Sequence, residues 1–329
     1  MVVRKMQRKQ CSFFLCVLIM LGVLLGACSS NHDTESPRGV LTAENQNKTN
    51  DRTITYLGKN YVVPAKIDRI VVTGALEALE DAQALDVKPV GAMTISGKFP
   101  AVFAQILQEA HPIGERMQPN FEEILKVSPD IILSSDKFPT ATQEQLGKIS
   151  THIAISHFAT DGDANLRLLG ELSGKQELAE KIISQYHSEA AQAKSNLPQS
   201  LQNKKIIAVR LRVGNLNLYP ANIFFNDILY GDLGLSVPEE IKAVKAQEII
   251  SLERLSEINP DYLFVMQAPG ENPAHPRALE DLEENPIWQN IKAVQNKKVF
   301  VNVVDPLLQG VAIGGKMQFL RAATEKLLQ

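Results

Sequence analysis

Short apolar runs alternate with amphipathic segments along most of this chain. The clearest unit spans residues 120–133, where a short helix, closed by Pro129-Asp130, precedes a buried strand at 131–133. The same pattern returns at 251–264 and aligns with the first copy without a gap, at an offset of 131 residues. Two copies of one helix–strand unit predict two similar lobes.

Other apolar runs extend this pattern into each half of the chain. They predict strands at 53–63, 70–72, 153–155, 206–209, 262–265 and 299–303, with amphipathic helices between them. Such alternation predicts α/β lobes with parallel sheets covered by helices. Residues 175–197 carry apolar side chains near i, i+4 spacing and predict a helix about 33 Å long. We therefore expect lobes at 53–162 and 201–329, joined by linking helices within 163–200.

The N-terminus departs from the globular pattern. Four basic residues within positions 4–9 precede an apolar run from Cys11 to Ala27, which predicts a secretory signal over 1–27. Leu25-Gly-Ala-Cys28 resembles the bacterial lipobox, which predicts cleavage, acylation of Cys28 and a polar flexible tether over 28–52. The alternative is an uncleaved membrane anchor, because the 17 apolar residues are almost enough for a span.

Composition narrows the classes of function. An apolar content of 44% and a charged content of 22% are typical of a soluble globular protein. Removal of residues 1–27 takes away four positive charges, so the formal net charge falls from −3 to −7, which argues against nucleic-acid binding. Only Cys28 then remains of the three cysteines, so no disulfide is expected within the mature chain.

Two kinds of chemistry find little support in the sequence. Direct binding of Zn²⁺ or Mn²⁺ requires converging histidines, but the six histidines form no His-x-His or His-x₃-His pair. Common catalytic motifs such as a Walker A loop, His-Glu-x-x-His or Gly-x-Ser-x-Gly are also missing from the sequence. An enzyme built from a distant nucleophile and base, acting on a chelate, stays open as an alternative.

Five segments are informative in their order along the chain: Pro64–Val72, Lys88–Ala92, Pro119–Leu133, Asn259–Val265 and Asn285–Phe300. Together they resemble the substrate-binding lipoproteins of bacterial iron–siderophore ABC importers, over residues 53–329. The resemblance implies two α/β lobes joined by a single long helix, with the ligand in the cleft between them. It also implies an Fe(III) chelate as ligand, no cofactor and no direct metal ligands. The implied partners are a permease dimer with a cytoplasmic ATPase, and we expect a monomer.

In the family that the chain resembles, one glutamate on each lobe docks into arginine pockets of the permease. The matching positions here are Glu122 and Glu253. A carboxylate in the first turn of a helix is favoured by the helix dipole, and pairing with arginine adds geometric specificity. The alternative is that each glutamate only stabilises its own helix.

The strand that opens the second lobe supplies the strongest candidates for ligand binding. Arg210 and Arg212 alternate along it and are expected to point to the same side. Arginines on an apolar strand need anionic partners, which a ferric chelate or an internal acid would provide. Tyr219 is a candidate for stacking on the chelate or hydrogen bonding to it, with a role in the core as the alternative.

Polar loops of the first lobe are expected to complete the site. Lys98 and Lys137 are its candidate cations, with Arg116 and Ser135 as weaker choices, and a solvated surface charge is the alternative for either lysine. Resemblance around Arg210–Tyr219 favours ferric citrate or a citrate–hydroxamate siderophore, with catecholates ranked after them. Haem and cobalamin remain alternative ligands, because apolar cleft walls would also suit them.

Overall fold

The computed structural model describes residues 51–329, so the predicted signal peptide, Cys28 and most of the predicted tether lie outside the described residues. The described chain begins with an antiparallel hairpin of β1 (Arg52–Tyr56) and β2 (Lys59–Val63). The strand character expected over 53–63 is divided between these two strands. The chain turns between them at Leu57 and Gly58, whose φ values of 47° and 77° suit a two-residue hairpin turn.

The first lobe is built on a six-stranded sheet with the order β6-β5-β4-β3-β7-β8. Its parallel strands are β3 (Ile70–Thr73), β4 (Gly91–Thr94), β5 (His111–Glu115), β7 (Ile131–Ser135) and β8 (Thr151–Ile155), and the short edge strand β6 (Gln118–Pro119) is antiparallel to β5. The connecting helices are α1 (Leu76–Ala84), η1 (Ala101–Phe103), α2 (Ala104–Leu107), α3 (Phe121–Lys126) and α4 (Thr140–Gly147).

The second lobe contains a five-stranded sheet with the order β11-β10-β9-β12-β13. Three strands are parallel, β9 (Ile206–Arg212), β12 (Tyr262–Met266) and β13 (Val299–Val301), whereas β10 (Asn215–Leu218) and β11 (Glu248–Ile250) run antiparallel to their neighbours. Its helices are η3 (Gln199–Asn203), the π-helix η4 (Asp227–Asp232), α7 (Glu239–Ala243), α8 (Leu252–Ile258), η5 (Pro269–Glu271), α9 (Ala278–Glu283), α10 (Pro286–Gln289) and α11 (Lys292–Gln295).

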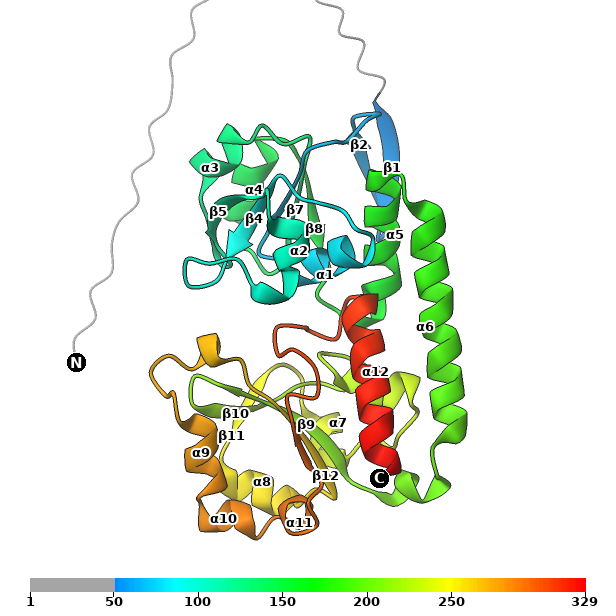
Figure 1. Ribbon diagram of the computed structural model, residues 1–329, viewed down its shortest axis with the longest axis vertical. Helices are drawn as coiled ribbons and strands as arrows, with labels where there is room; N and C mark the ends of the chain where they lie inside the picture. The colour runs from blue at the N-terminus through cyan, green and yellow to red at the C-terminus, as the bar shows by residue number, and fades with distance from the viewer. Residues whose placement is uncertain (1–50) are drawn as a thin grey trace, which may run out of the picture. The chain divides into compact units, whose positions relative to one another are not determined.

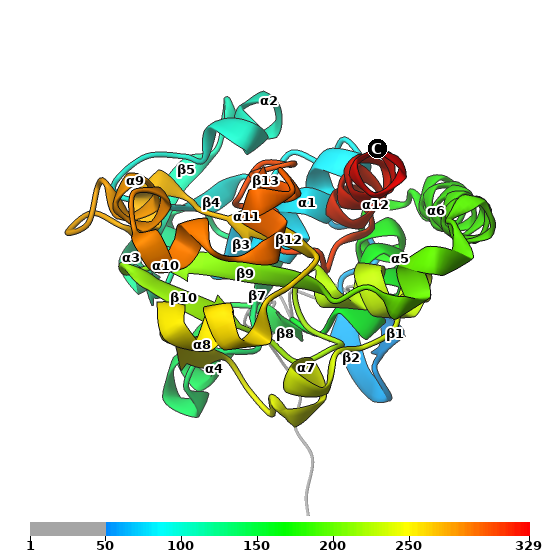
Figure 2. The same cartoon turned by 90° about the horizontal axis from the view of Figure 1, so that it is seen from below.

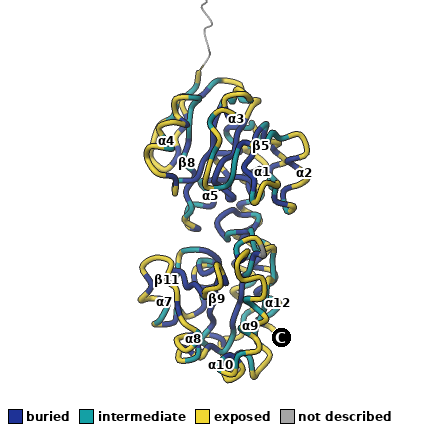
Figure 3. The backbone as a smooth tube through the Cα atoms, turned by 90° about the vertical axis from the view of Figure 1, so that its left-hand side faces the viewer, coloured by how far each residue is buried: buried dark blue, intermediate teal, exposed yellow. Residues whose placement is uncertain are grey.

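The predicted α/β architecture with two lobes is confirmed, and the sheets are mixed at their edges. Strand β10 was not expected, because its polar residues gave it no apolar run. Val213 and Gly214, with φ values of 50° and 71°, reverse the chain so that β10 pairs back onto β9. Figure 3 shows the buried strands inside each lobe and exposed residues on the surrounding loops and helices.

Three helices lie along one side of both lobes. η2 (Ala159–Asp161) leads into α5 (Gly162–Ser173), which ends at Gly174 with a φ of 72°, and α6 (Gln176–Asn196) then runs toward the second lobe. The C-terminal helix α12 (Ile313–Leu328) packs against α6, α1 and η4 (Figure 1). Seen from below, α6 and α12 lie together at one side (Figure 2). Thus α12 adds a second helical contact between the lobes to the expected strut. Among the helices of residues 51–329, none combines the length and apolar character of a membrane span.

A buried ion-pair cluster fixes α12 to this helical side. The side chain of Lys316 is 7% exposed, and its Nζ lies 2.7 Å from Asp227 Oδ2 and 3.6 Å from Asp232 Oδ2. The same Nζ donates a hydrogen bond to the backbone oxygen of Ala159 over 3.3 Å. The cluster therefore connects α12 with η4 and with the segment that enters α5.

We expect Lys316→Met to lower the free energy of unfolding by about 3–5 kcal/mol, because it leaves two partly buried carboxylates without their cation. Urea unfolding measures the change. Lys326→Met, at the more exposed end of α12, is the control and should change the free energy by less than about 0.5 kcal/mol. Equal effects of the two substitutions would contradict a stabilising role for the cluster.

Candidate functional site

A cavity of about 650 Å³ lies between the two lobes. Its lining follows the carboxyl ends of strands in both sheets: Ile95 follows β4, Arg116 follows β5, Arg212 ends β9, and Ala268 and Asn302 follow β12 and β13. Loops at the carboxyl ends of parallel strands are where α/β sheets bind ligands. Most of the remaining lining is apolar, with Val213, Pro273, Ala274, Pro306 and Leu307.

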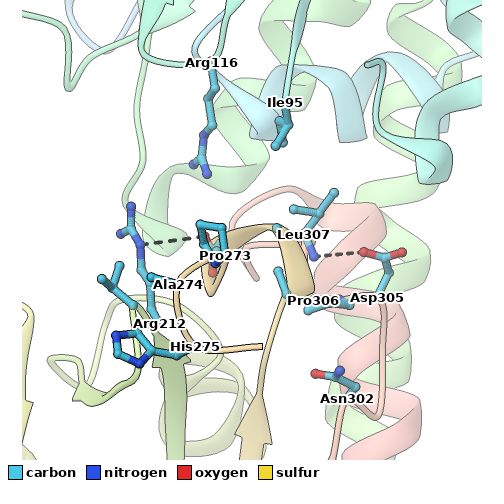
Figure 4. Close-up of a pocket in the computed structure, with 14 residues that line it drawn as sticks. Ile95, Arg116, Arg212, Pro273, Ala274, His275, Asn302, Asp305, Pro306 and Leu307 are labelled. Carbon is cyan, nitrogen blue, oxygen red and sulfur yellow. Dashed lines mark hydrogen bonds and ion pairs between the residues drawn. The ribbon is translucent and has the colours of Figure 1, made fainter. Parts of the chain in front are cut away.

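Arg116 and Arg212 enter this cavity from opposite lobes. Figure 4 shows Arg116 pointing down from the first lobe and Arg212 pointing up toward it. The backbone amide of Arg116 donates to the Thr94 oxygen over 2.9 Å, and its buried Nε has no hydrogen-bond partner within the described chain. Burial lowers the pKa of Arg116, but a guanidinium keeps its charge in proteins. Two guanidinium groups that face one another across a cavity favour an anion between them.

Arg210 lies beneath the cavity, where its side chain is 3% exposed. Its Nε donates to Glu271 Oε2 over 2.7 Å, and its Nη2 donates to the Pro306 oxygen over 3.0 Å. Arg212 shares the same carboxylate, with Nε 3.9 Å from Glu271 Oε1. Arg210 and Arg212 thus point to the same side of β9, as predicted, and the internal acid considered as an alternative partner is present beside them.

The other candidates surround this group at different depths. Tyr219 is buried behind the cavity with its ring 5.2 Å from that of Phe224, and burial raises its pKa. Desolvation lowers the pKa of Lys137, while the charges of Glu77 and Arg116 shift it in opposite directions. Neither Lys137 nor Tyr219 forms part of the cavity lining.

Ser135 and Lys98 lie less directly at the site. The buried hydroxyl of Ser135 accepts a hydrogen bond from the amide of Lys137 over 3.2 Å, so it shapes that turn. Lys98 is exposed and pairs through its backbone with Ile95, beside the cavity. Contact of either side chain with a ligand stays a prediction.

Sequence reasoning missed the two acids that line the cavity, Glu271 and Asp305. Glu271 and the segment 302–307 follow β12 and β13 directly, so the rule that placed Arg116 and Lys137 at strand ends could have found them. Proline and glycine surround Glu271 and are typical of a turn, so this segment did not stand out as part of a binding site. Within residues 51–329, no cluster of three or more His, Cys, Asp or Glu side chains could hold a metal ion.

Glu122 and Glu253 lie on α3 and α8, in the first turn of each helix, and both are exposed. The Asn120 side chain accepts from the amide of Glu122, and Ser251 caps α8 in the same way through the amide of Arg254. The backbone amide of Glu253 itself and, to a smaller extent, the Ser251 hydroxyl lower the pKa of the Glu253 carboxyl. Neither glutamate forms an ion pair within the described residues. Figure 1 places α3 and α8 on different lobes, so one partner binding both must span the cleft.

Comparisons with known proteins agree with this architecture. Residues 71–302 match the model of a family described as periplasmic binding protein. The chain is 44% identical to the iron-uptake system-binding protein of Bacillus subtilis, over 95% of this chain and 97% of that protein. A crystal structure of the triscatecholate siderophore binding protein FeuA from B. subtilis, complexed with ferri-bacillibactin, is 47% identical, with a TM-score of 0.82, and covers 84% of this chain and 98% of that chain. The Fe(3+)-citrate-binding protein YfmC of B. subtilis is 24% identical over 86% of both chains.

Proposed function

Since the chain belongs to the periplasmic binding protein family, we propose that it captures a ferric triscatecholate siderophore and delivers it to a bacterial ABC importer. The resemblance noted in the sequence is confirmed by the family match and by relatives that are binding proteins of transport systems rather than enzymes. The Fe(III) chelate is the transported ligand, and the protein residues hold the chelate rather than the metal.

The convergence of Arg116 and Arg212 in an apolar cavity carries this proposal. A ferric triscatecholate combines flat apolar rings with oxygens that share an excess of negative charge. Guanidinium groups pair with such oxygens through directed, charge-assisted hydrogen bonds. The apolar lining around Val213, Pro306 and Leu307 suits the rings and excludes water, which strengthens the pairing.

This proposal reverses the order of ligands favoured by the sequence, in which citrate and citrate–hydroxamate chelates came first. The FeuA relative with the ferri-bacillibactin ligand is 47% identical, whereas the citrate-binding relative is 24% identical. A largely apolar lining is also better matched to aromatic rings than to the carboxylate-rich surface of ferric citrate. Ferric citrate remains the second candidate because arginine forks recognise carboxylates equally well.

Delivery requires a fixed position at the membrane and a partner there. In the proposed arrangement, acylated Cys28 anchors the chain to the outer face of the cell membrane, and the protein acts as a monomer. Glu122 and Glu253, exposed on separate lobes, dock with the permease dimer. A separate cytoplasmic ATPase supplies the energy for import.

Titration of the protein's fluorescence with a panel of chelates tests the proposed ligand. We expect a ferric triscatecholate to bind roughly a hundredfold more tightly than ferric citrate, an uncharged ferric trihydroxamate, haem or cobalamin. Tighter binding of ferric citrate would replace the proposed ligand with the second candidate. Tighter binding of haem or cobalamin, or no binding of any ferric chelate, would overturn the proposed function itself.

A further inference from the structure

The carboxylate of Glu271 occupies the place beside the arginines of the second lobe where an anionic ligand would bind. It lies at the end of η5, with its side chain 14% exposed. One oxygen accepts from Arg210 Nε over 2.7 Å, and the other lies 3.9 Å from Arg212 Nε. Glu271 also forms part of the cavity lining, so its charge faces the same space as any ligand in the cleft.

Backbone contacts fix the position of this carboxylate. The backbone oxygen of Glu271 accepts a hydrogen bond from the amide of Val213 over 3.0 Å. The backbone amide of Glu271 donates to the backbone oxygen of Ala268 over 2.9 Å. The next residue, Asn272, is buried and bonds both to the amide of Gly214 over 2.9 Å and to the oxygen of Leu211 over 3.0 Å. The turn that carries Glu271 is therefore tied to the β9–β10 hairpin, which carries the arginines.

Burial of Arg210 explains why an internal acid is present. A guanidinium that is 3% exposed is costly to keep without a counter-charge, and Glu271 provides one in the absence of ligand. The pairing is incomplete, because the buried Nη1 of Arg210 has no hydrogen-bond partner within residues 51–329. One donor of the buried arginine thus remains available while the carboxylate neutralises part of its charge.

We propose that Glu271 acts as an internal competitor for anions and so determines which ligands the cleft accepts. This inference rests on the proposed binding of a ferric chelate and concerns the selectivity of the same site. A small anion such as sulfate reaches the arginines of one lobe only, and beside Arg212 it must replace the attraction that Glu271 already supplies. A ferric chelate is large enough to reach Arg116 and Arg212 together, so it gains attraction from the first lobe that Glu271 does not neutralise. Glu271 therefore keeps common small anions out of the cleft.

Glu271→Gln tests this role, because glutamine can still accept a hydrogen bond from Arg210 Nε but carries no charge. Glu284→Gln is the matched control: it removes the same charge from an exposed pair with Arg277, 3.2 Å apart and away from the cavity. We expect Glu271→Gln to bind inorganic sulfate about tenfold more tightly, but the ferric triscatecholate less than about threefold more tightly. Affinity for an uncharged ferric trihydroxamate should stay within about twofold, and Glu284→Gln should match the parent chain in every titration.

The sulfate titration separates this inference from the proposed function. If the parent chain binds no ferric chelate but Glu271→Gln gains affinity for sulfate, the proposed function is wrong. The inference that Glu271 competes with anions for the arginines is then still supported. Unchanged or weaker sulfate binding by Glu271→Gln, with its urea unfolding as in the parent chain, would overturn the inference. Weaker chelate binding by this variant would also overturn it, because it would make Glu271 a support for the ligand rather than its competitor.

Discussion

Replacing Arg116 and Arg212 together by alanine is expected to weaken binding of a ferric triscatecholate by a factor of roughly a hundred or more. Each side chain enters the cavity from a different lobe and faces the other across it. A hydrogen bond to a charged group contributes about 1.5–3 kcal/mol, and two such losses correspond to a factor of this size. Fluorescence titration of the double variant against the parent chain measures the loss.

The two single variants and one control make this expectation specific. Arg116→Ala and Arg212→Ala should each weaken binding, because the chelate loses its cation on one lobe only. Arg254→Ala and Arg277→Ala together remove the same charge from exposed ion pairs of the second lobe and should leave the affinity within about twofold. If the cavity double variant bound as tightly as this control, the cations of the cleft would not be the ligand's partners.

Reversing charge at both predicted docking positions is expected to abolish iron uptake. In cells that depend on this receptor, Glu122→Arg with Glu253→Arg should reduce uptake of the labelled ferric chelate to background, because arginine would repel the arginine pockets that we expect on the permease. Both glutamates are exposed and lie away from the cavity, so affinity for the chelate should be unchanged. The pair of measurements separates docking from ligand capture.

A matched pair of exposed acids controls for surface charge. Glu109→Arg with Glu280→Arg makes the same change of charge on the same two lobes, at positions that are not first-turn residues of α3 or α8. Uptake should persist in this control. If uptake persisted in the variant with both docking glutamates reversed, Glu122 and Glu253 would not be docking residues. The assignment of the ligand site would not be affected by that result.

The fold was predictable where apolar runs and helix ends coincide. The repeated helix–strand units became α3 with β7 and α8 with β12, and the long amphipathic run became α6. Hairpins were harder to predict, because their turns depend on backbone angles that an apolar pattern does not encode. Thus the turn at Leu57 and Gly58 lies inside a segment expected only to have strand character, and the turn at Val213 and Gly214 leads into β10, which was not expected.

The candidate site was predictable only in part, for a similar reason. Strand position and charge indicated Arg212 and, as a weaker choice, Arg116, and both line the cavity. Contact of these residues or of Lys137 with a ligand stays a prediction. The pairing of Arg210 with Glu271 joins residues 61 positions apart, and only the register of β9 beside β12 brings them together. Local sequence therefore indicated the arginines of the site but neither Glu271 nor its pairing with them.

The central claim is that arginines of both lobes contact one anionic chelate in the cleft. A crystal structure of the protein with a ferric triscatecholate bound tests this claim most directly. We expect the chelate between the lobes, with its oxygens about 2.7–3.2 Å from guanidinium nitrogens of both Arg116 and Arg212. A chelate bound outside the cavity, or held in it without contact to either arginine, would contradict this mode of binding.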